Sequence, residues 1–265
     1  YDHVIVCDDV SSDMTQDIAT SLGAIVIKHS TNLGYGAAIK TIFNESKKID
    51  CDVLVTFDAD GQHQISEIDS ILQPLKDKKA DIVIGSRFLG SAKDLPKYRK
   101  IGIKTITSLT NTLTGSNITD SQSGFRAYSK KVLNEITPTE SGMGISTEIL
   151  IKAAKKEHRV TEIPITISYE GSTHSQKAVS HGTSVVMSTI KHVAIERPLL
   201  YYGVTGLCVI IIGLIFGGWT IQIFSKENIV PPGIALIGIG GVILGTILLI
   251  TATILYSIVN VIREK

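Results

Sequence analysis

The sequence predicts an α/β domain, with a mostly parallel sheet and helices on both faces, joined to a carboxyl-terminal hairpin of two transmembrane helices. Two observations lead to this prediction. Short runs rich in valine and isoleucine alternate with segments of helical period over the first 198 residues. Beyond residue 198 there are only five charged residues, and they leave two long uncharged segments.

The composition narrows the class of protein. Apolar residues make up 43% of the 265 residues, which excludes a disordered chain. The formal net charge of +1 argues against general nucleic-acid binding, which requires a basic excess. The three cysteines, Cys7, Cys51 and Cys208, form no C-x-x-C pair, so neither a disulfide framework nor a zinc site is expected. A domain facing the cytosol fits these features best.

Four strands and three helices are predicted in order along the first part of the chain. The strands are residues 4–7, 24–27, 53–57 and 82–84, and the helices lie near residues 14–22, 36–48 and 65–79. We interpret NLGYG before the second helix as its start, capped by Asn32 or a neighbour. Alternation at this spacing implies βαβ units. Ligands of such sheets bind beyond the carboxyl ends of the strands, so the residues after each strand are the candidates for chemistry.

Acidic residues follow two of the predicted strands. Asp8 and Asp9 come directly after the first, and the segment DADGQ (residues 58–62) comes after the third. Several carboxylates at one edge repel one another unless a cation or hydrogen-bond donors compensate. Carboxylate and amide oxygens suit Mg²⁺ or Mn²⁺, which keep waters and bridge to phosphates. The pattern predicts a divalent metal that holds a diphosphate, with a solvated turn as the alternative for a lone D-x-D.

Basic residues follow the fourth predicted strand. Arg87 comes directly after it, and the segment LPKYRK (residues 95–100), which includes Arg99, lies soon after. In a domain without a basic excess, a basic cluster that faces acidic strand ends is suited to phosphate binding. A solvated basic surface is the alternative.

Two uncharged segments at the end of the chain, residues 201–224 and 233–262, are each long enough to span a bilayer. The short connection between them makes the pair an antiparallel hairpin. Basic residues precede the first helix and follow the second, whereas the connection holds only Lys226. Both chain ends and the domain of the first 198 residues are therefore expected in the cytoplasm, in a multi-pass membrane protein. Buried soluble helices are the alternative, but two in tandem would need far more soluble protein to cover them.

Two further features accompany the hairpin. Gly213-x-x-x-Gly217 and Gly241-x-x-x-Gly245 lie near the middle of the helices, where small residues permit close backbone approach. We expect them to pack the hairpin, and a homo-oligomer through the same glycines stays open. Residues 179–198 place apolar side chains on one stripe flanked by basic ones, which indicates an amphipathic juxtamembrane helix. A helix packed on the domain is an equal alternative.

Six segments of the soluble domain form an ordered set: DDVSSD, NLGYGAAI, DADGQH, GSRF, LPKYRK and DSQSGFR. Together with the membrane hairpin, this set resembles the dolichol-phosphate mannose synthase-like branch of the family 2 glycosyltransferases. The resemblance implies a GT-A fold, with residues 1–178 as the catalytic domain. It also implies a nucleotide-diphosphate sugar as donor, Mg²⁺ or Mn²⁺ as cofactor, and a polyprenyl phosphate as lipid acceptor at the cytoplasmic face of the membrane.

The resemblance also assigns roles to individual residues. The nucleotide would be bound by Cys7, Asp9, Asp58 and Ala59, and the metal by Asp60 and Gln62. The acceptor phosphate would be bound by Arg99 and Lys177. The catalytic residues would be Asp60, Arg87 and Arg99. Arg87 and Arg99 would approach the donor and acceptor phosphates. Asp120, Ser123 and Gly124 match the D-x-x-S-G-F turn of the family, where Gly124 is expected to supply a backbone conformation that other residues resist.

The chain departs from the family in two places. A strand pattern begins within three residues of Tyr1, so the family's first strand and the nucleotide-binding segment after it are expected to be missing, and the intact enzyme is expected to be longer. In the arm before the membrane helices, Glu170 lies near where the family has an arginine. Lys177 is expected to take the place of the terminal basic residue of that arm.

The leading hypothesis is inverting, metal-dependent transfer of one hexose to a polyprenyl phosphate. A phosphate monoester has a second pKa of about 6, so the acceptor is largely a dianion at neutral pH and needs no strong base. The metal and the basic side chains would stabilise the charge on the departing nucleotide. Asp8 and Glu148 are candidate supporting groups, with a structural role as the alternative for each.

Two interpretations outside active enzymes stay open. An inactive membrane scaffold of the same fold is favoured by the missing first strand. A membrane-tethered receiver-like signalling domain is suggested by the acidic strand ends, but the chain lacks the Lys-Pro pair of such domains. Among enzymes, a processive polysaccharide synthase is disfavoured, because its Q-x-x-R-W motif is absent and Trp219 lies in the first membrane helix.

Overall fold

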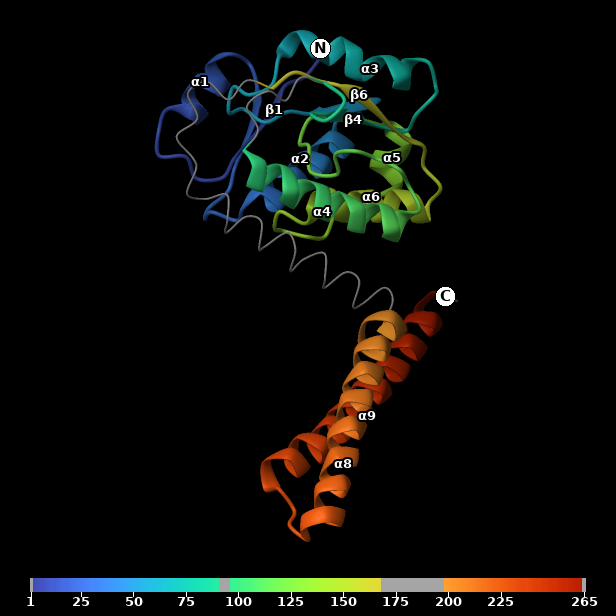
Figure 1. Ribbon diagram of the computed structural model, residues 1–265. Helices are drawn as coiled ribbons and strands as arrows, with labels where there is room; N and C mark the ends of the chain where they lie inside the picture. The colour runs from blue at the N-terminus through green and yellow to red at the C-terminus, as the bar shows by residue number, and fades with distance from the viewer. Residues whose placement is uncertain (1, 91–95, 168–197, 264–265) are drawn as a thin grey trace. The chain divides into compact units, whose positions relative to one another are not determined.

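The computed structural model describes residues 2–90, 96–167 and 198–263 (Figure 1). The chain divides into two compact units, Tyr1–Thr189 and Ile190–Lys265. Glu170, Lys177 and most of the expected juxtamembrane helix lie outside the described residues.

The first sheet of the soluble unit contains two parallel strands. β1 (Ile5–Asp8) pairs with β2 (Ile25–Lys28), and α1 (Thr15–Ser21) connects them. α2 (Tyr35–Lys48) follows β2 and packs against β1. All four elements agree with the ranges predicted from the sequence to within one residue.

The second sheet has four strands in the order β3-β5-β4-β6. β3 (Val53–Thr56) and β4 (Ile82–Ser86) match predicted strands, whereas β5 (Arg126–Ser129) and β6 (Val160–Pro164) are not predicted. The sequences RAYS and VTEIP lack the continuous apolar run that marks the other strands. β6 is parallel to β4, but β5 is antiparallel to both of its neighbours, so this sheet is mixed.

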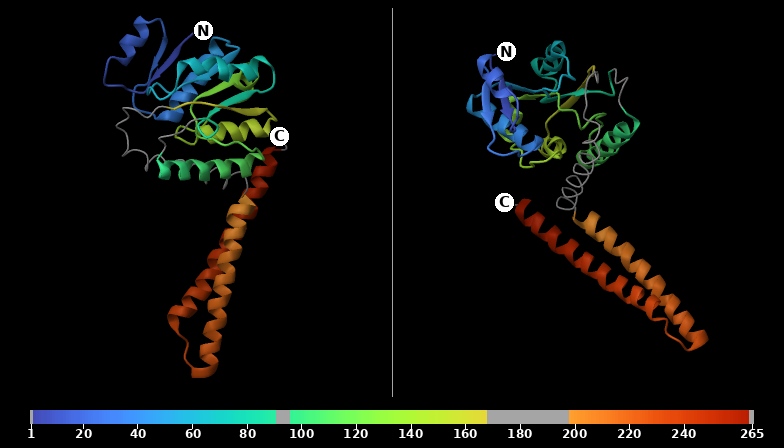
Figure 2. Two further views of the ribbon diagram at one scale, coloured as in Figure 1. Left: turned by 45° about the horizontal axis from the view of Figure 1, so that its top comes forward. Right: turned by 90° about the vertical axis from the view of Figure 1, so that its left-hand side faces the viewer.

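Helices cover both faces of the second sheet, as predicted (Figures 1 and 2). Besides α2, they are α3 (Ile68–Lys76), α5 (Lys130–Glu135) and α6 (Ile145–Lys155). The short helix η1 (Ile65–Glu67) contacts α3, and α4 (Lys97–Thr114) contacts α6. Ile82 and Ile84 of β4 pack in one core cluster with α2, α5 and α6, whereas Val83 packs in a second cluster with α3. Both faces of β4 are buried, and accordingly its first three residues, Ile82, Val83 and Ile84, are all apolar.

The strand directions bring three motifs to one edge of this sheet. β3 and β4 are each antiparallel to β5, so they run in the same direction, and β6 runs with them. The segments after β3 and β4 and the turn before β5 therefore meet at the same edge. These segments carry the motifs DADGQH, GSRF and DSQSGFR. The antiparallel strand β5 is thus the element that joins the third motif to the other two.

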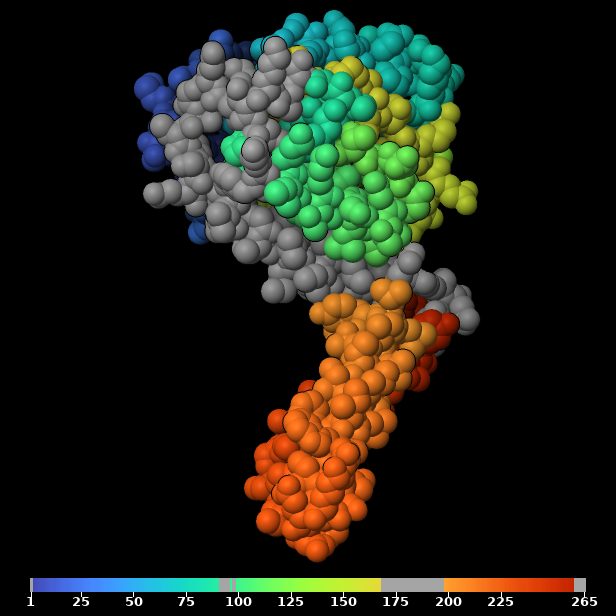
Figure 3. Space-filling model, viewed as in Figure 1, coloured from blue at the N-terminus to red at the C-terminus, as the bar shows by residue number. Residues whose placement is uncertain are grey.

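α4 lies on the surface of the soluble unit (Figure 3). One of its faces packs against α6, and its exposed residues include Ile101, Lys104 and Ser108. Arg99 lies in the first turn of this helix and is half-buried.

The second unit contains two long helices joined by a short loop. The π-helical turn η2 (Leu199–Gly203) leads into α8 (Val204–Glu227), and α9 (Pro232–Arg263) follows the loop. Leu199–Glu227 and Pro232–Val259 are long and apolar enough to cross a membrane. Most of their large apolar side chains are exposed in this structure, which argues against the alternative of buried soluble helices.

Glycines bring α8 and α9 into backbone contact. A Cβ atom added at Gly213 would lie 2.7 Å from the Val242 nitrogen, and one added at Gly241 would lie 2.9 Å from the Gly213 Cα atom. A Cβ atom at Gly245 would lie 2.6 Å from the carbonyl oxygen of Gly206. Small residues are therefore needed between these helices, and the expected packing of the hairpin is confirmed.

Candidate active site

Asp58, which follows β3, lies against the turn that precedes β5. A Cβ atom added at Gly124 would lie 2.4 Å from the Asp58 Oδ2 atom, so a glycine is needed to leave room for this carboxylate. Thr56 Oγ1 donates to the carbonyl oxygen of Gly124 at 2.7 Å and ties the turn to β3. Gly124 is not among the glycines with positive φ. The expectation of a special backbone conformation is therefore wrong, and the requirement at Gly124 is space.

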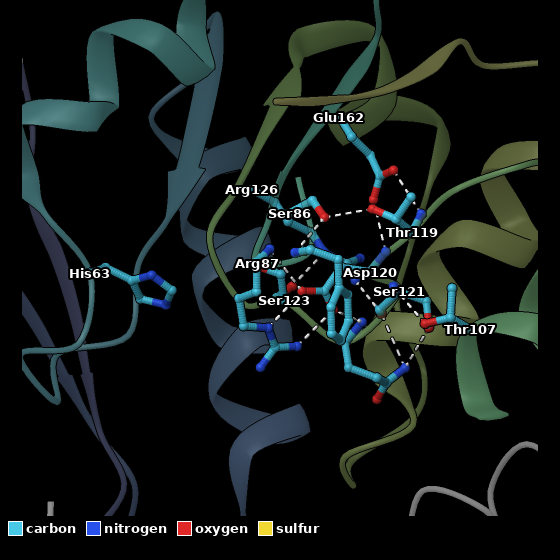
Figure 4. Close-up of polar contacts among 12 residues, drawn as sticks. His63, Ser86, Arg87, Thr107, Thr119, Asp120, Ser121, Ser123, Arg126 and Glu162 are labelled. Atoms are coloured by element: carbon cyan, nitrogen blue, oxygen red, sulfur yellow. Dashed lines mark hydrogen bonds and ion pairs between the residues drawn. The ribbon is translucent and has the colours of Figure 1, made fainter. Parts of the chain in front are cut away.

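His63 packs beside Asp58. Its ring contacts the rings of Phe57 and Phe125 at centroid distances of 5.5 and 5.3 Å, and its Nε2 atom lies 3.7 Å from Asp58 Oδ2. The side chain is 5% exposed, and in the described part of the chain its Nδ1 atom has no hydrogen-bond partner. Figure 4 shows His63 apart from the main polar network. His63 lies in the DADGQH motif, yet it was not a predicted site residue.

The proposed metal ligands lie in a tight exposed turn. Gly61 has a φ of 75°, and the Gln62 backbone amide donates to Asp60 Oδ1 at 3.1 Å. Asp60 and Ala59 are exposed, and Gln62 is half-buried. The described residues contain no group of three or more His, Cys, Asp or Glu side chains that could hold a metal. The carboxylate of Asp60 and the amide oxygen of Gln62 nevertheless fit Mg²⁺ or Mn²⁺, which commonly complete their shells with water and phosphate oxygens.

Asp9 binds the loop that leads into α2. Its carboxylate accepts hydrogen bonds from the amides of Leu33 and Gly34 at 2.8 and 2.7 Å and contacts His29 Nδ1 at 2.7 Å. Burial opposes ionisation, but the bonds from Leu33, His29 and Gly34 outweigh it and hold the pKa of Asp9 below its usual value. Gly34, with a φ of 88°, is the N-cap of α2 and makes no side-chain capping bond. The expected side-chain cap is therefore wrong, since Asn32 instead donates to the Asp9 carbonyl oxygen at 3.3 Å.

Cys7 contacts the same histidine. Its Sγ atom lies 3.5 Å from His29 Nε2, which is also 2.9 Å from Thr41 Oγ1. Burial raises the pKa of the Cys7 thiol; a hydrogen bond with Thr41 opposes this effect, and the negative charges of Asp9 and Asp8 add to it. The thiol is therefore neutral at pH 7 and unsuited to nucleophilic chemistry.

Arg87, which follows β4, forms a two-pronged ion pair with Asp120. Arg87 Nε lies 2.6 Å from Asp120 Oδ2, and Nη2 lies 2.7 Å from Oδ1. The Arg87 backbone amide also donates to Oδ2 at 3.2 Å. The Asp120 side chain is fully buried and that of Arg87 is 14% exposed. A bidentate pair of this kind holds the plane of the guanidinium in one orientation.

Glu162 of β6 holds the turn that carries Asp120. Its Oε2 and Oε1 atoms accept hydrogen bonds from the backbone amides of Thr119 and Asp120 at 2.7 and 2.9 Å (Figure 4). The hydroxyls of Thr119 and Ser86 lie 2.6 Å apart and link this turn to the end of β4. Glu162 is in none of the motifs described above, and its strand, VTEIP, has no continuous apolar run that would have indicated it in the sequence.

Arg126 is the arginine of the motif DSQSGFR and is buried beneath the turn. It is 1% exposed and donates to the carbonyl oxygens of Ser123, Ser146 and Ser121 at 2.8, 3.0 and 2.7 Å. Ser123 is 2% exposed, and within the described residues its hydroxyl has no hydrogen-bond partner. Arg126 thus supports the backbone of the turn.

Arg99 differs from Arg87 in its contacts. It makes no hydrogen bond or ion pair with another residue in the described part of the chain, and it is half-buried. Among the described residues, no side chain therefore competes with an anionic ligand for its guanidinium. Lys177, the other residue predicted at the acceptor phosphate, lies outside the described residues.

The two candidate supporting groups hold loops. Glu148 is 1% exposed, accepts the Glu140 amide at 2.8 Å and pairs with Lys152 Nζ at 2.7 Å. Burial opposes its ionisation, but the bonds from Lys152, Thr139 and Glu140 hold the pKa of Glu148 below its usual value. Asp8 is 3% exposed and accepts the Ser11 amide at 2.8 Å. The contacts of both residues favour the structural role.

The predicted site residues fall into two groups. Asp58 and Arg87 both contact the turn of residues 120–124 at the edge of the second sheet. Cys7 and Asp9 lie at the end of β1 and are joined by His29. One edge of the second sheet thus carries both the acidic turn and a positioned arginine.

Comparisons with known proteins identify relatives of this chain by sequence. The chain is 32% identical over 208 residues to UDP-N-acetylglucosamine--dolichyl-phosphate N-acetylglucosaminyltransferase of Methanococcus voltae, covering 71% of this chain and 81% of the relative. It is 30% identical over 193 residues to dolichyl-phosphate hexose transferase of Haloferax volcanii, covering 73% and 82%.

A solved structure and a family match complete the comparison. Glucosyl-3-phosphoglycerate synthase from Mycobacterium tuberculosis, in complex with Mn²⁺, UDP-glucose and phosphoglyceric acid, aligns with a TM-score of 0.56 at 16% identity, covering 72% of this chain and 68% of that one. This likeness shows the fold, which is the GT-A fold expected, and overturns the receiver-like alternative. Residues 1–137 match the family described as Glycosyl transferase family 2. The chain belongs to glycosyl transferase family 2.

Proposed function

We propose that this protein is a membrane-bound enzyme that transfers a hexose from a nucleotide-diphosphate sugar to a polyprenyl phosphate. The observation that carries the proposal is the shared sheet edge, where the acidic turn of residues 58–62 and the positioned Arg87 both meet the turn before β5. A sugar diphosphate and a phosphate acceptor need such a pairing of metal-binding oxygens with a fixed cation. The names of the two dolichyl-phosphate relatives support the lipid acceptor.

The donor would be held by residues from both sheets. In the proposal Asp58 and Ala59 contact the nucleotide from the end of β3, and Cys7 and Asp9 contact it from the end of β1. Asp60 and Gln62 would bind Mg²⁺ or Mn²⁺ together with the diphosphate. When bound, the cation would neutralise charge on the leaving nucleoside diphosphate. Asp9 is suited to its part because a fifth of its side chain, 21%, is exposed while three donors fix its position.

The acceptor would react without a strong base. A phosphate monoester is largely dianionic at neutral pH. In the proposed inverting reaction, an acceptor oxygen bonds to the anomeric carbon from the side opposite the diphosphate, whose bond to that carbon breaks. Arg87 and Arg99 would hold the phosphates in place and stabilise the charge that develops. Lys177 is proposed as a further contact to the acceptor phosphate.

The membrane segments would keep the enzyme beside its lipid. We propose two membrane-spanning helices, an amphipathic segment at residues 179–198, and a cytoplasmic location for residues 1–178 and both chain ends. The two apolar helices and the distribution of basic residues support this topology. The glycines that suggested a homo-oligomer lie between α8 and α9 of one chain, so they lend an oligomer no support.

The proposal is tested by lipid-linked sugar formation. Membranes from cells that express the protein are incubated with labelled UDP- and GDP-sugars, Mg²⁺ or Mn²⁺ and polyprenyl phosphates, and the lipid is extracted. We expect one sugar to appear on the lipid, and EDTA to prevent it. Failure with every donor in the panel, while the protein is folded and membrane-bound, would favour the inactive scaffold.

Asp60→Ala is the first variant to assay. Loss of its carboxylate removes the exposed oxygen ligand of the acidic turn, so metal-dependent transfer should fall by at least about a hundredfold, while expression and membrane attachment are retained. Asp77→Asn, which alters an exposed surface carboxylate paired with Lys79, is the matched control and should transfer as the wild type does. Full activity of Asp60→Ala would remove the basis of the metal assignment.

A further inference from the structure

Arg87 is held through two successive carboxylates from distant parts of the chain. The two carboxylate oxygens of Asp120 accept hydrogen bonds from Nε and Nη2 of Arg87 at 2.6 and 2.7 Å. The turn that carries Asp120 is in turn held by Glu162 through two adjacent backbone amides, at 2.7 and 2.9 Å. Figure 4 shows these contacts as a continuous series from Glu162 through the turn to Arg87.

The geometry makes the position of Asp120 depend on Glu162. The carboxylate of Glu162 accepts one amide hydrogen on each oxygen, so both amides at the start of the turn are satisfied by a single side chain. If one oxygen became an NH₂ group, two donors would face each other and one amide would lose its partner. The turn would then shift, and the two-pronged geometry with Arg87, which tolerates little displacement, would weaken.

We propose that Glu162 is a positioning residue for Arg87, acting through the Thr119–Asp120 turn, and that it thereby sets the rate of phosphate-dependent transfer. This inference rests on the proposed function, since it assigns the fixed guanidinium to the phosphates of donor or acceptor. Glu162 touches no reacting atom in this scheme. Glu162 contributes by keeping the Arg87 guanidinium in one orientation, because the free side chain would sample many rotamers.

The opposite end of the same strands offers a matched control. Asp81, directly before β4, accepts from the backbone amide and Nε of Arg159, directly before β6, at 2.8 and 3.2 Å. This pair also joins an aspartate, an arginine and the β4–β6 ladder, but the Arg159 side chain is 57% exposed and lies away from the motif edge. Asp81→Asn therefore removes a comparable ion pair outside the proposed site.

The test uses the full chain in membranes and a double-mutant cycle. Glu162→Gln should lower kcat/KM for lipid transfer about tenfold, whereas Asp81→Asn should change it less than about twofold. In an Arg87→Ala background, Glu162→Gln should lower the residual rate less than about twofold, because the group it positions is gone. A tenfold effect that persists in that background, or no effect in the wild type, overturns the proposal.

Backbone hydrogen exchange provides a readout that does not depend on activity. The Arg87 amide donates to Asp120 Oδ2, so a peptide that contains it reports the position of Asp120. Its exchange should accelerate in Glu162→Gln and stay unchanged in Asp81→Asn. Equal exchange in wild type and Glu162→Gln overturns the positioning role. Absence of transfer by the wild type would count against the proposed function alone, because the exchange comparison still decides whether Glu162 orders Arg87.

Discussion

At the scale of single residues, the site depends both on the missing side chain of Gly124 and on the hydrogen-bond donors around Asp9. Gly124 has no Cβ, and the Asp58 carboxylate occupies the space that a Cβ would fill. Asp9 keeps its charge because backbone amides of the α2 loop and His29 bind it. Asp58 is thus accommodated by the space at Gly124, whereas Asp9 is held by hydrogen-bond donors.

Gly124→Ala should impair the use of the donor. A Cβ at this position would lie 2.4 Å from Asp58 Oδ2, so the carboxylate must move and the proposed nucleotide contact is lost. We expect kcat/KM for the sugar nucleotide to fall by about tenfold or more, because small misplacements of binding groups have effects of this size.

Gly102→Ala is the matched control for this change. A Cβ there meets no atom within 4 Å, and Gly102 lies in the interior of α4. Alanine should stabilise that helix by up to about 1 kcal/mol and leave steady-state transfer unchanged. If Gly124→Ala behaved like Gly102→Ala, Asp58 would not be the residue that the glycine accommodates.

At the scale of elements, one buried carboxylate joins a loop to a helix. Glu148 of α6 accepts amides of the 139–140 segment and pairs with Lys152 one turn later. The same loop reaches α2, where the Ala37 amide donates to the Ser141 carbonyl oxygen at 3.2 Å. Glu148 therefore stabilises contacts between two helices that pack on the second sheet.

Stability should depend on pH through Glu148. Its pKa is depressed in the folded protein, so its ionisation stabilises the fold above the unfolded pKa of about 4.3, and this contribution is lost as pH falls through the lower folded value. Glu148→Gln should reduce the free energy of unfolding at pH 7 by about 2 kcal/mol, since a buried charged acceptor is lost. The difference from wild type should shrink below pH 4.

Pulse proteolysis in denaturant, with the protein in detergent, measures this difference at each pH. Glu45→Gln is the control, because Glu45 pairs with the exposed Lys48 on α2 and such surface pairs contribute less than about 1 kcal/mol. A Glu148→Gln variant as stable as wild type at pH 7 would contradict the structural role of this carboxylate.

At the scale of the whole molecule, the two units of the chain place their apolar side chains differently. The soluble unit buries its apolar residues in two clusters on either side of the second sheet. The second unit instead exposes large apolar side chains along both helices and buries glycines between them. A lipid environment favours this arrangement. Lipid tails are as apolar as the exposed side chains, so helices in lipid associate through close packing of small residues.

The proposed topology predicts where the loop between α8 and α9 lies. Ser225→Cys, placed at the end of the first span in a cysteine-free background, should react with a membrane-impermeant maleimide added to intact cells. Cysteine at Asp2, in the soluble unit, should react only after the membrane is opened. The basic residues at the chain ends favour the cytoplasmic side, which is the physical reason for this orientation. The reverse labelling pattern would refute it.

Much of the molecule was predictable because its signals are local. Four strands, three helices, the acidic turn after β3 and both apolar helices follow from patterns within windows of at most about 30 residues. β5 and β6 were not predicted because RAYS and VTEIP carry polar residues within strands, and their pairing depends on neighbours elsewhere in the chain. Local propensity does not report such long-range pairing.

By itself, the sequence determined the family, the candidate ligands of the metal and the presence of two apolar spans, since each depends on residue types at short spacing. Only the tertiary structure decided that Arg87 is held by Asp120, 33 residues away, and that Glu162 holds Asp120 from 42 residues away. It also showed that Gly124 supplies space and not an unusual conformation. These facts depend on the antiparallel direction of β5, which brings distant backbone and side-chain atoms to one edge of the sheet.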